Sequence, residues 1–140
     1  MKLEHKKINF EDARGTIRDI FQSEPKEHCT VIHSKKNSIR GNHLHKTTVQ
    51  HDLVVIGRML VLGRKEGSDV IEEMVQEPGD LITWEKGEAH ELIALDDLIF
   101  VTFHNGPRGG EDFEKDTTRL EVPLHKAAGK TLEDLLAASA

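Results

Sequence analysis

The distribution of apolar residues along the chain is typical of short β-strands. Segments such as TIRDIF and HCTVIH are rich in β-branched and aromatic residues, and turn-forming segments such as EDARG and SEPKE separate them. The pattern predicts about ten strands, at residues 6–9, 16–21, 28–33, 39–45, 49–57, 58–67, 69–76, 80–84, 89–95 and 98–104. Short strands at such regular spacing indicate an all-β sandwich or barrel.

The pattern changes after residue 104. Residues 105–119, NGPRGGEDFEKDTTR, are rich in glycine and charge, which favours a solvated loop; the functional alternative is a lid or rim over the barrel mouth. The segment TRLEVP, residues 118–123, could return as a last edge strand. From Thr131 the leucines fall at helical spacing, and Thr131 with Asp134 resembles a capping box, so a short C-terminal helix is predicted at about 131–138.

Length, composition and charge narrow the possible partners. A chain of 140 residues suits one domain, 1–140, and its formal charge of −6 argues against nucleic acid and against an anionic membrane surface. No apolar run approaches the roughly 20 residues that a membrane-spanning helix needs, and the N-terminal sequence lacks the apolar centre of a signal peptide. Cys29 is the only cysteine, which excludes an internal disulfide and favours a reducing, cytoplasmic setting.

Nine histidines draw attention to metal or proton chemistry. His43 and His45 stand two positions apart on one predicted strand, so their imidazoles point to the same face. His90 supplies a third ligand if its strand pairs nearby, and the amide oxygen of Gln50 can supply a fourth. Because three buried imidazoles need partners or a metal, we predict that these four residues bind a divalent ion, with zinc, nickel, iron and manganese left open.

Gln50 and His51 are neighbours, so only one of them faces inward in a regular strand. Alternation favours Gln50, whereas a one-residue bulge would bring His51 inward instead. A glutamate at position 50 would add a negative charge that glutamine lacks, and we therefore expect weaker or more selective metal binding. His104 ends a strand and could reach the barrel mouth.

The two histidine-containing blocks resemble the motifs of the cupin family. The positions that match those motifs are His43, His45, Gly57, Gly79, Gly87 and His90. The positions that depart from them are Asn37, Gln50, Glu85 and Ala94, which stand where the family has glycine, glutamate, proline and asparagine. The resemblance covers about residues 30–105 and implies a cupin double-stranded β-helix, or jelly-roll barrel, with the short α-helix at its C-terminus. It does not specify a reaction, because this barrel hosts many chemistries.

Within that family, the run RGNHLHK and the upstream EDARGTIRDI are similar to cupins of bacterial surface-sugar biosynthesis. These include nucleotide-sugar epimerases and ketoisomerases and the cupin domain of capsular-polysaccharide enzymes. The resemblance implies that Arg40 lies near the phosphate side of the substrate, although simple alternation puts Arg40 opposite His43 unless Gly41 bends the strand. Trp84, Phe100 or Phe103 are expected in the pocket wall.

The absence of tyrosine departs from the sugar epimerases, which usually use a tyrosine as the acid. The candidates for moving the proton are then His51, His104, Glu88, Glu91 or bound water. Three functions stay open: a metal-binding sugar or nucleotide-sugar isomerase or epimerase acting next to a carbonyl, an iron-dependent dioxygenase, and a non-catalytic module that binds a small ligand. A homodimer formed by strand exchange or edge pairing is also expected.

Overall fold

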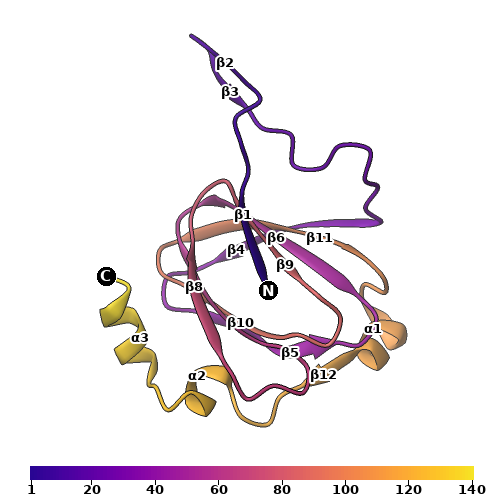
Figure 1. Cartoon of the computed structure of the whole chain (residues 1–140), viewed down its shortest axis with the longest axis vertical. Coiled ribbons are helices and arrows are strands. Elements are labelled where there is room, and N and C mark those ends of the chain that lie inside the picture. The colour runs from indigo at the N-terminus through magenta and orange to yellow at the C-terminus, as the bar shows by residue number, and fades with distance from the viewer.

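The computed structural model describes residues 1–140, and its strands form two five-stranded antiparallel sheets that face each other (Figure 1). Across the first sheet the order is β1 (Lys2–His5), β9 (Asp80–Trp84), β6 (Val49–Ile56), β11 (Leu98–Asn105) and β4 (His28–Ser34). Across the second it is β12 (Thr117–Arg119), β5 (Ile39–His45), β10 (Ala89–Ala94), β7 (Met59–Arg64) and β8 (Glu72–Gln76). From β4 to β12 the chain passes between the sheets at every step except the β7–β8 hairpin. This is a jelly-roll barrel, so the predicted cupin-type all-β fold is confirmed.

Two apolar clusters stabilise the barrel, one inside it and one outside. The inner cluster lies between the sheets and contains Val54, Met59, Val61, Ile82, Trp84, Leu92, Ala94, Leu98 and Phe100. The outer cluster covers the back of the second sheet and contains Leu60, Leu62, Ala89, Ile93, Leu95, Leu124 and Leu135. The helices α2 (Leu124–Ala127) and α3 (Leu132–Ala138) supply its last two members. Because both of its faces are covered, every residue of β10 is buried.

The predicted C-terminal helix is confirmed as α3. The side chain of Thr131 accepts a hydrogen bond from the backbone of Asp134, and the Asp134 carboxylate accepts one from the backbone of Thr131. This capping box satisfies backbone groups that a helix start otherwise leaves free. Leu135 on the inward side of α3 is buried in the outer cluster. None of the helices combines the length and the apolar character that crossing a membrane requires.

The N-terminal strands predicted at 6–9 and 16–21 are wrong in position. The first strand is β1, which pairs with β9 so that Lys2 lies opposite Thr83. β2 (Phe10–Asp12) and β3 (Gly15–Ile17) form a hairpin that stands clear of the barrel in Figure 1. Composition shows which residues favour a strand. It does not show which other strand they pair with, because that pairing depends on the whole fold.

The loop predicted over residues 105–119 is wrong for its second half. It contains α1 (Gly110–Asp116) and β12, and β12 extends the second sheet by pairing with β5. The last edge strand expected at 118–123 therefore exists, but it spans Thr117–Arg119. Pairing of β12 with β5 brings α1 to the end of the barrel where β5 finishes at His45.

Candidate active site

A cavity of about 440 Å³ opens between the two sheets, beside α1. Its polar lining comes from Thr30, Arg40, His43, His45, Thr48, Gln50, His90, Thr102, His104 and Arg108. Its apolar lining includes Phe100 and Phe113. No carboxylate lines this cavity, and two arginines do, so its wall favours a neutral or anionic ligand. The volume lies within the range of pockets that hold small molecules.

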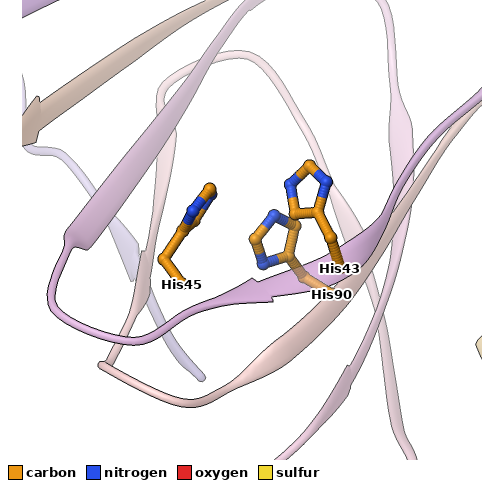
Figure 2. A group of neighbouring side chains, drawn as sticks. All are labelled: His43, His45 and His90. Carbon is orange, nitrogen blue, oxygen red and sulfur yellow. The ribbon is translucent and has the colours of Figure 1, made fainter. Parts of the chain in front are cut away.

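Three imidazoles converge on one wall of the cavity, as the spacing of the sequence predicts (Figure 2). His43 and His45 project from β5, and His90 lies directly opposite His43 on the paired strand β10. One ring nitrogen from each residue lies within 4.8 Å of those of the other two. The His43 and His90 rings meet edge to face, with centroids 4.7 Å apart. The cluster thus combines two neighbouring strands of one sheet.

A glycine allows β5 and β10 to approach closely at this point. Gly41 has a φ of +87°, and a Cβ on it would lie 2.7 Å from the backbone oxygen of His90. Asn42 also has a positive φ, and the register of β10 against β5 shifts beside His90. This irregularity lets Arg40 line the same cavity as His43 instead of pointing to the opposite face. Arg40 is held there by hydrogen bonds to the Ser34 hydroxyl, at 2.7 Å, and to the His33 carbonyl, at 3.0 Å.

Burial keeps the cluster histidines neutral. Desolvation, with the charges of His45 and Arg119, lowers the pKa of His43 from 6.5 to about 4. Desolvation, with the neighbouring His43 and His45, lowers the pKa of the fully buried His90 well below its usual value. For His45 burial also lowers the pKa, while the Asp116 charge and a hydrogen bond with Gln50 oppose the shift. At neutral pH the cluster therefore presents unprotonated imidazoles, the form that binds metals or accepts protons.

Asp116, at the end of α1, contacts the cluster although sequence reasoning did not select it. Its Oδ2 lies 3.5 Å from Nδ1 of His45. It also accepts hydrogen bonds from the Thr47 backbone, at 2.7 Å, and from the Thr48 hydroxyl, at 2.7 Å. A carboxylate beside Nδ1 favours the tautomer with the proton there, which leaves the other ring nitrogen free. Only the folding of α1 and β12 against β5 brings this residue close, so no local pattern could have found it.

Asp52 is the second residue that sequence reasoning missed. It follows Gln50 by two positions on the inward face of β6, and strand alternation would have placed it inside the barrel. It is fully buried and accepts hydrogen bonds from Gln50, Trp84 and Thr102. Burial raises the pKa of Asp52, while these hydrogen bonds lower it.

The remaining sequence candidates divide between the cavity and other places. Gln50 and His104 line the cavity, and Nδ1 of His104 is buried without a partner. His51 faces the other side of β6, where its ring contacts Thr83 and Lys26, so the bulge that would have turned it inward is absent.

The two acidic candidates do not line the cavity. Glu91 lies on the back of β10 against His125, because it alternates with the inward His90. Glu88 binds the amino group of Met1 and the backbone of Glu85.

Two of the three aromatic candidates for the cavity wall lie elsewhere. Phe103 packs on Phe21 outside the barrel, since strand alternation turns it away from the interior. Trp84 is buried below the cavity and stacks on His90, with ring centroids 5.0 Å apart. Phe100, the third aromatic residue expected in the wall, does line the cavity.

Comparison with known proteins adds to this geometry. The sequence matches no protein-family model and no curated protein. Among solved structures it is similar to CapF, a capsular polysaccharide assembling protein from Staphylococcus aureus, with 25% identity and a TM-score of 0.60 over 84% of this chain. The match covers 34% of CapF, so this chain spans about a third of the length of CapF.

Two further solved structures match over most of their own length. QdtA, a sugar 3,4-ketoisomerase from Thermoanaerobacterium thermosaccharolyticum in complex with TDP, has 16% identity and a TM-score of 0.72, covering 86% of this chain and 88% of QdtA. ChmJ, a 3′-monoepimerase from Streptomyces bikiniensis in complex with dTDP-quinovose, has 18% identity and a TM-score of 0.76, covering 91% and 72%. The barrel of this chain therefore has the fold of cupin-type sugar-biosynthesis enzymes, as the resemblance in its motifs implies.

The residues of the cavity fit a divalent metal ion. Zinc–imidazole bonds of about 2.0–2.1 Å bring the ligand nitrogens of one site within ~4 Å of each other, so nitrogens within 4.8 Å need only small rotations. Nδ1 of His90 is buried and has no hydrogen-bond partner, which is costly unless another group occupies that place. His43, His45, His90 and the Gln50 amide oxygen would hold the ion.

Proposed function

We propose that this protein is an isomerase or epimerase that acts next to the carbonyl of a nucleotide-linked keto sugar. The observation that carries the proposal is the convergence of three neutral imidazoles in a cavity that contains two arginines and no carboxylate. A neutral imidazole can remove a proton from carbon next to a carbonyl, and arginines bind a diphosphate. QdtA and ChmJ, solved with TDP and dTDP-quinovose, support a sugar nucleotide as the ligand.

In the proposed reaction, an imidazole of the cluster removes the proton from the carbon beside the carbonyl. That carbon carries a hydroxyl group, so when the electron pair of the C–H bond forms a C=C bond and the carbonyl π pair moves to oxygen, the substrate becomes an enediolate. The imidazolium then returns the proton to the former carbonyl carbon, and the hydroxyl proton passes to the oxygen on that carbon. The carbonyl has then moved by one position, and the base is as it began. Arg40 and Arg108 bind the phosphates. When a divalent ion is bound, it stabilises negative charge on the substrate oxygen.

An epimerase requires an acid on the second face of the substrate, and His104 on β11 is the candidate for that place. Desolvation, with the charges of His28 and Arg108, lowers the pKa of His104 to about 4, so this residue is unprotonated at neutral pH. An unprotonated imidazole accepts a hydrogen bond from a sugar hydroxyl but is a poor acid. The low pKa of His104 therefore favours an isomerase that uses one base over an epimerase that uses two residues.

The test measures deuterium incorporation into a TDP-linked 4-keto hexose incubated with the protein in D₂O. We expect deuterium at the carbon next to the carbonyl and a product whose carbonyl has moved. His45→Ala should lower the rate about 10²–10⁴-fold and abolish bound metal in elemental analysis. His51→Ala is the matched control, because this neighbouring histidine faces away from the cavity, and both properties should be retained.

A non-catalytic module that binds the same ligand is the second candidate, which the absence of tyrosine favours. It predicts tight binding of the sugar nucleotide with no deuterium incorporation at any metal loading. That outcome would replace the proposed isomerase by a binding function.

A further inference from the structure

Asp52 is a fully buried carboxylate whose hydrogen-bond donors are all neutral. Nε1 of Trp84 lies 2.9 Å from its Oδ2, the Thr102 hydroxyl 2.8 Å from its Oδ1, and Nε2 of Gln50 3.0 and 3.2 Å from the two oxygens. Burying a carboxylate without a cationic partner costs more free energy than burying an apolar side chain of the same size. Stability alone therefore does not explain an aspartate at this place.

The contact with Gln50 determines which end of its amide faces the histidines. A carboxylate that accepts hydrogen bonds must face the amide nitrogen, so the amide oxygen lies at the opposite end of the planar group. On that side Gln50 and His45 line the same cavity, and Gln50 raises the pKa of His45, as an amide oxygen near the ring does. The amide thus spans the distance between Asp52 and the cluster, with its nitrogen toward the carboxylate and its oxygen toward the imidazoles.

We propose that Asp52 is a positioning residue that fixes the Gln50 amide with its oxygen toward the histidine cluster. Gln50 and Asp52 lie two residues apart on the same face of β6, and the hydrogen bonds between them hold the amide in one orientation. The same carboxylate binds the Trp84 indole, which stacks on His90 at 5.0 Å. Asp52 therefore binds one residue that lies beside His45, Gln50, and one residue that stacks on His90, Trp84. This inference rests on the proposed function only where it concerns the metal ion.

A double substitution tests the orientation. In Asp52→Asn an amide nitrogen replaces one acceptor oxygen, so the orientation of Gln50 is no longer fixed. In Gln50→Glu with Asp52→Asn, the side chain at position 50 has an acceptor oxygen at both ends and needs no orienting partner, and the new amide at position 52 can donate to it. Asp80→Asn is the matched control, because Asp80 is a buried carboxylate that contacts His5 and the Glu77 backbone outside the cavity.

The experiment titrates zinc into metal-free protein by calorimetry. Loss of a residue that orients a metal ligand typically costs 10–100-fold in affinity, and we expect this loss in Asp52→Asn. The double variant should bind zinc at least as tightly as the original protein, and Asp80→Asn should keep the original affinity. Equal zinc affinity in Asp52→Asn and the original protein would overturn the role of Asp52 in orienting a metal ligand.

A second readout needs neither metal nor substrate. In the nitrogen NMR spectrum of metal-free protein, the Gln50 side-chain amide should exchange slowly with water because Asp52 holds it, and the chemical shifts of the His45 ring nitrogens should report the neighbouring amide. Asp52→Asn should accelerate the exchange and shift the His45 signals, while Asp80→Asn leaves both. Unchanged signals would overturn the positioning role. If the original protein binds no zinc, the metal site fails, and the amide orientation is still decided by these spectra.

Discussion

The unprotonated state of the cavity histidines gives the metal-free protein a defined pH dependence. His43 has a pKa of about 4 when folded and of about 6.5 when unfolded. Below pH 6.5 the unfolded chain therefore binds protons that the folded chain does not bind until about pH 4. The stability that neutral His43 contributes is fully present above pH 6.5 and is lost as the pH falls through this window. His104 adds to the loss in the same direction.

Urea unfolding of metal-free protein between pH 7.5 and 4.5 measures this effect. We expect the free energy of unfolding to fall with pH, and His43→Asn should show a shallower fall because one titrating group is removed. His33→Asn, at an exposed position, should keep the original slope. Identical slopes in all three proteins would contradict burial as the cause of the pKa shift.

Replacement of His104 separates the two proposed reactions. In a one-base isomerase His104→Gln removes only a hydrogen bond to the substrate, so we expect KM to rise and kcat to fall less than tenfold. In an epimerase it removes the acid, and kcat would fall 10²-fold or more. Steady-state kinetics with the keto-sugar nucleotide give both constants. A large fall in kcat with unchanged KM would reject the one-base reaction.

At the residue scale, strand alternation predicted some side chains and failed for others. It correctly turned Gln50 inward and would have found Asp52 by the same rule. It failed for Arg40, because Gly41 and Asn42 both have positive φ and rotate the strand. Asp116 is 71 residues beyond His45 in number and meets it only through tertiary folding, as its hydrogen bond to Thr47 across 69 positions illustrates.

At the element scale, β10 contacts the cavity with one face and the outer helices with the other. His90 faces the cavity, and the next residue, Glu91, is completely buried against α2. The Glu91 carboxylate accepts a hydrogen bond from the His125 backbone at 3.0 Å, and its other oxygen lies 2.6 Å from Nδ1 of His125. Glu91 is therefore a structural residue, which corrects its selection as a catalytic candidate.

Loss of the His125 side chain should destabilise the barrel. His125→Ala leaves a buried carboxylate oxygen without its partner, which costs about 2–4 kcal/mol. Urea unfolding should show this loss, while zinc affinity per folded molecule stays unchanged because the cluster faces the other side of β10. His33→Ala, at an exposed position, should change stability by less than about 0.5 kcal/mol. An equally small change in His125→Ala would mean that α2 does not depend on this contact.

The elements that sequence patterns located well are those with strong apolar runs bounded by turn residues. The predicted ranges overlap the observed strands β6, β7, β9, β10 and β11. The ends of the chain were located less well. β1 depends on a partner 75 or more residues away, and α1 carries too few apolar residues for a helical pattern to stand out from its charges.

At the scale of the whole molecule, two apolar surfaces of the single chain are exposed to solvent. Val31 and Val55 lie on the outer face of the first sheet, with 60% and 46% of their surface exposed. The projecting β2–β3 hairpin exposes Phe10 and Ile17 by 51% and 56%. Single exposed apolar residues are common, but apolar groups gathered on an open sheet face and on a projecting arm are typical of association. β4 is also an edge strand, which offers unpaired backbone groups.

We therefore expect a homodimer in which the first sheet of each chain is covered by its partner. Light scattering after size-exclusion chromatography should give twice the 15.8 kDa of one chain. Val31→Lys should shift the population to monomer, because a buried lysine without a partner opposes association. Val75→Lys is the matched control, since Val75 is an exposed valine on β8 of the other sheet. Dissociation by Val75→Lys and not by Val31→Lys would move the interface to the second sheet, and a monomeric original protein would exclude the dimer.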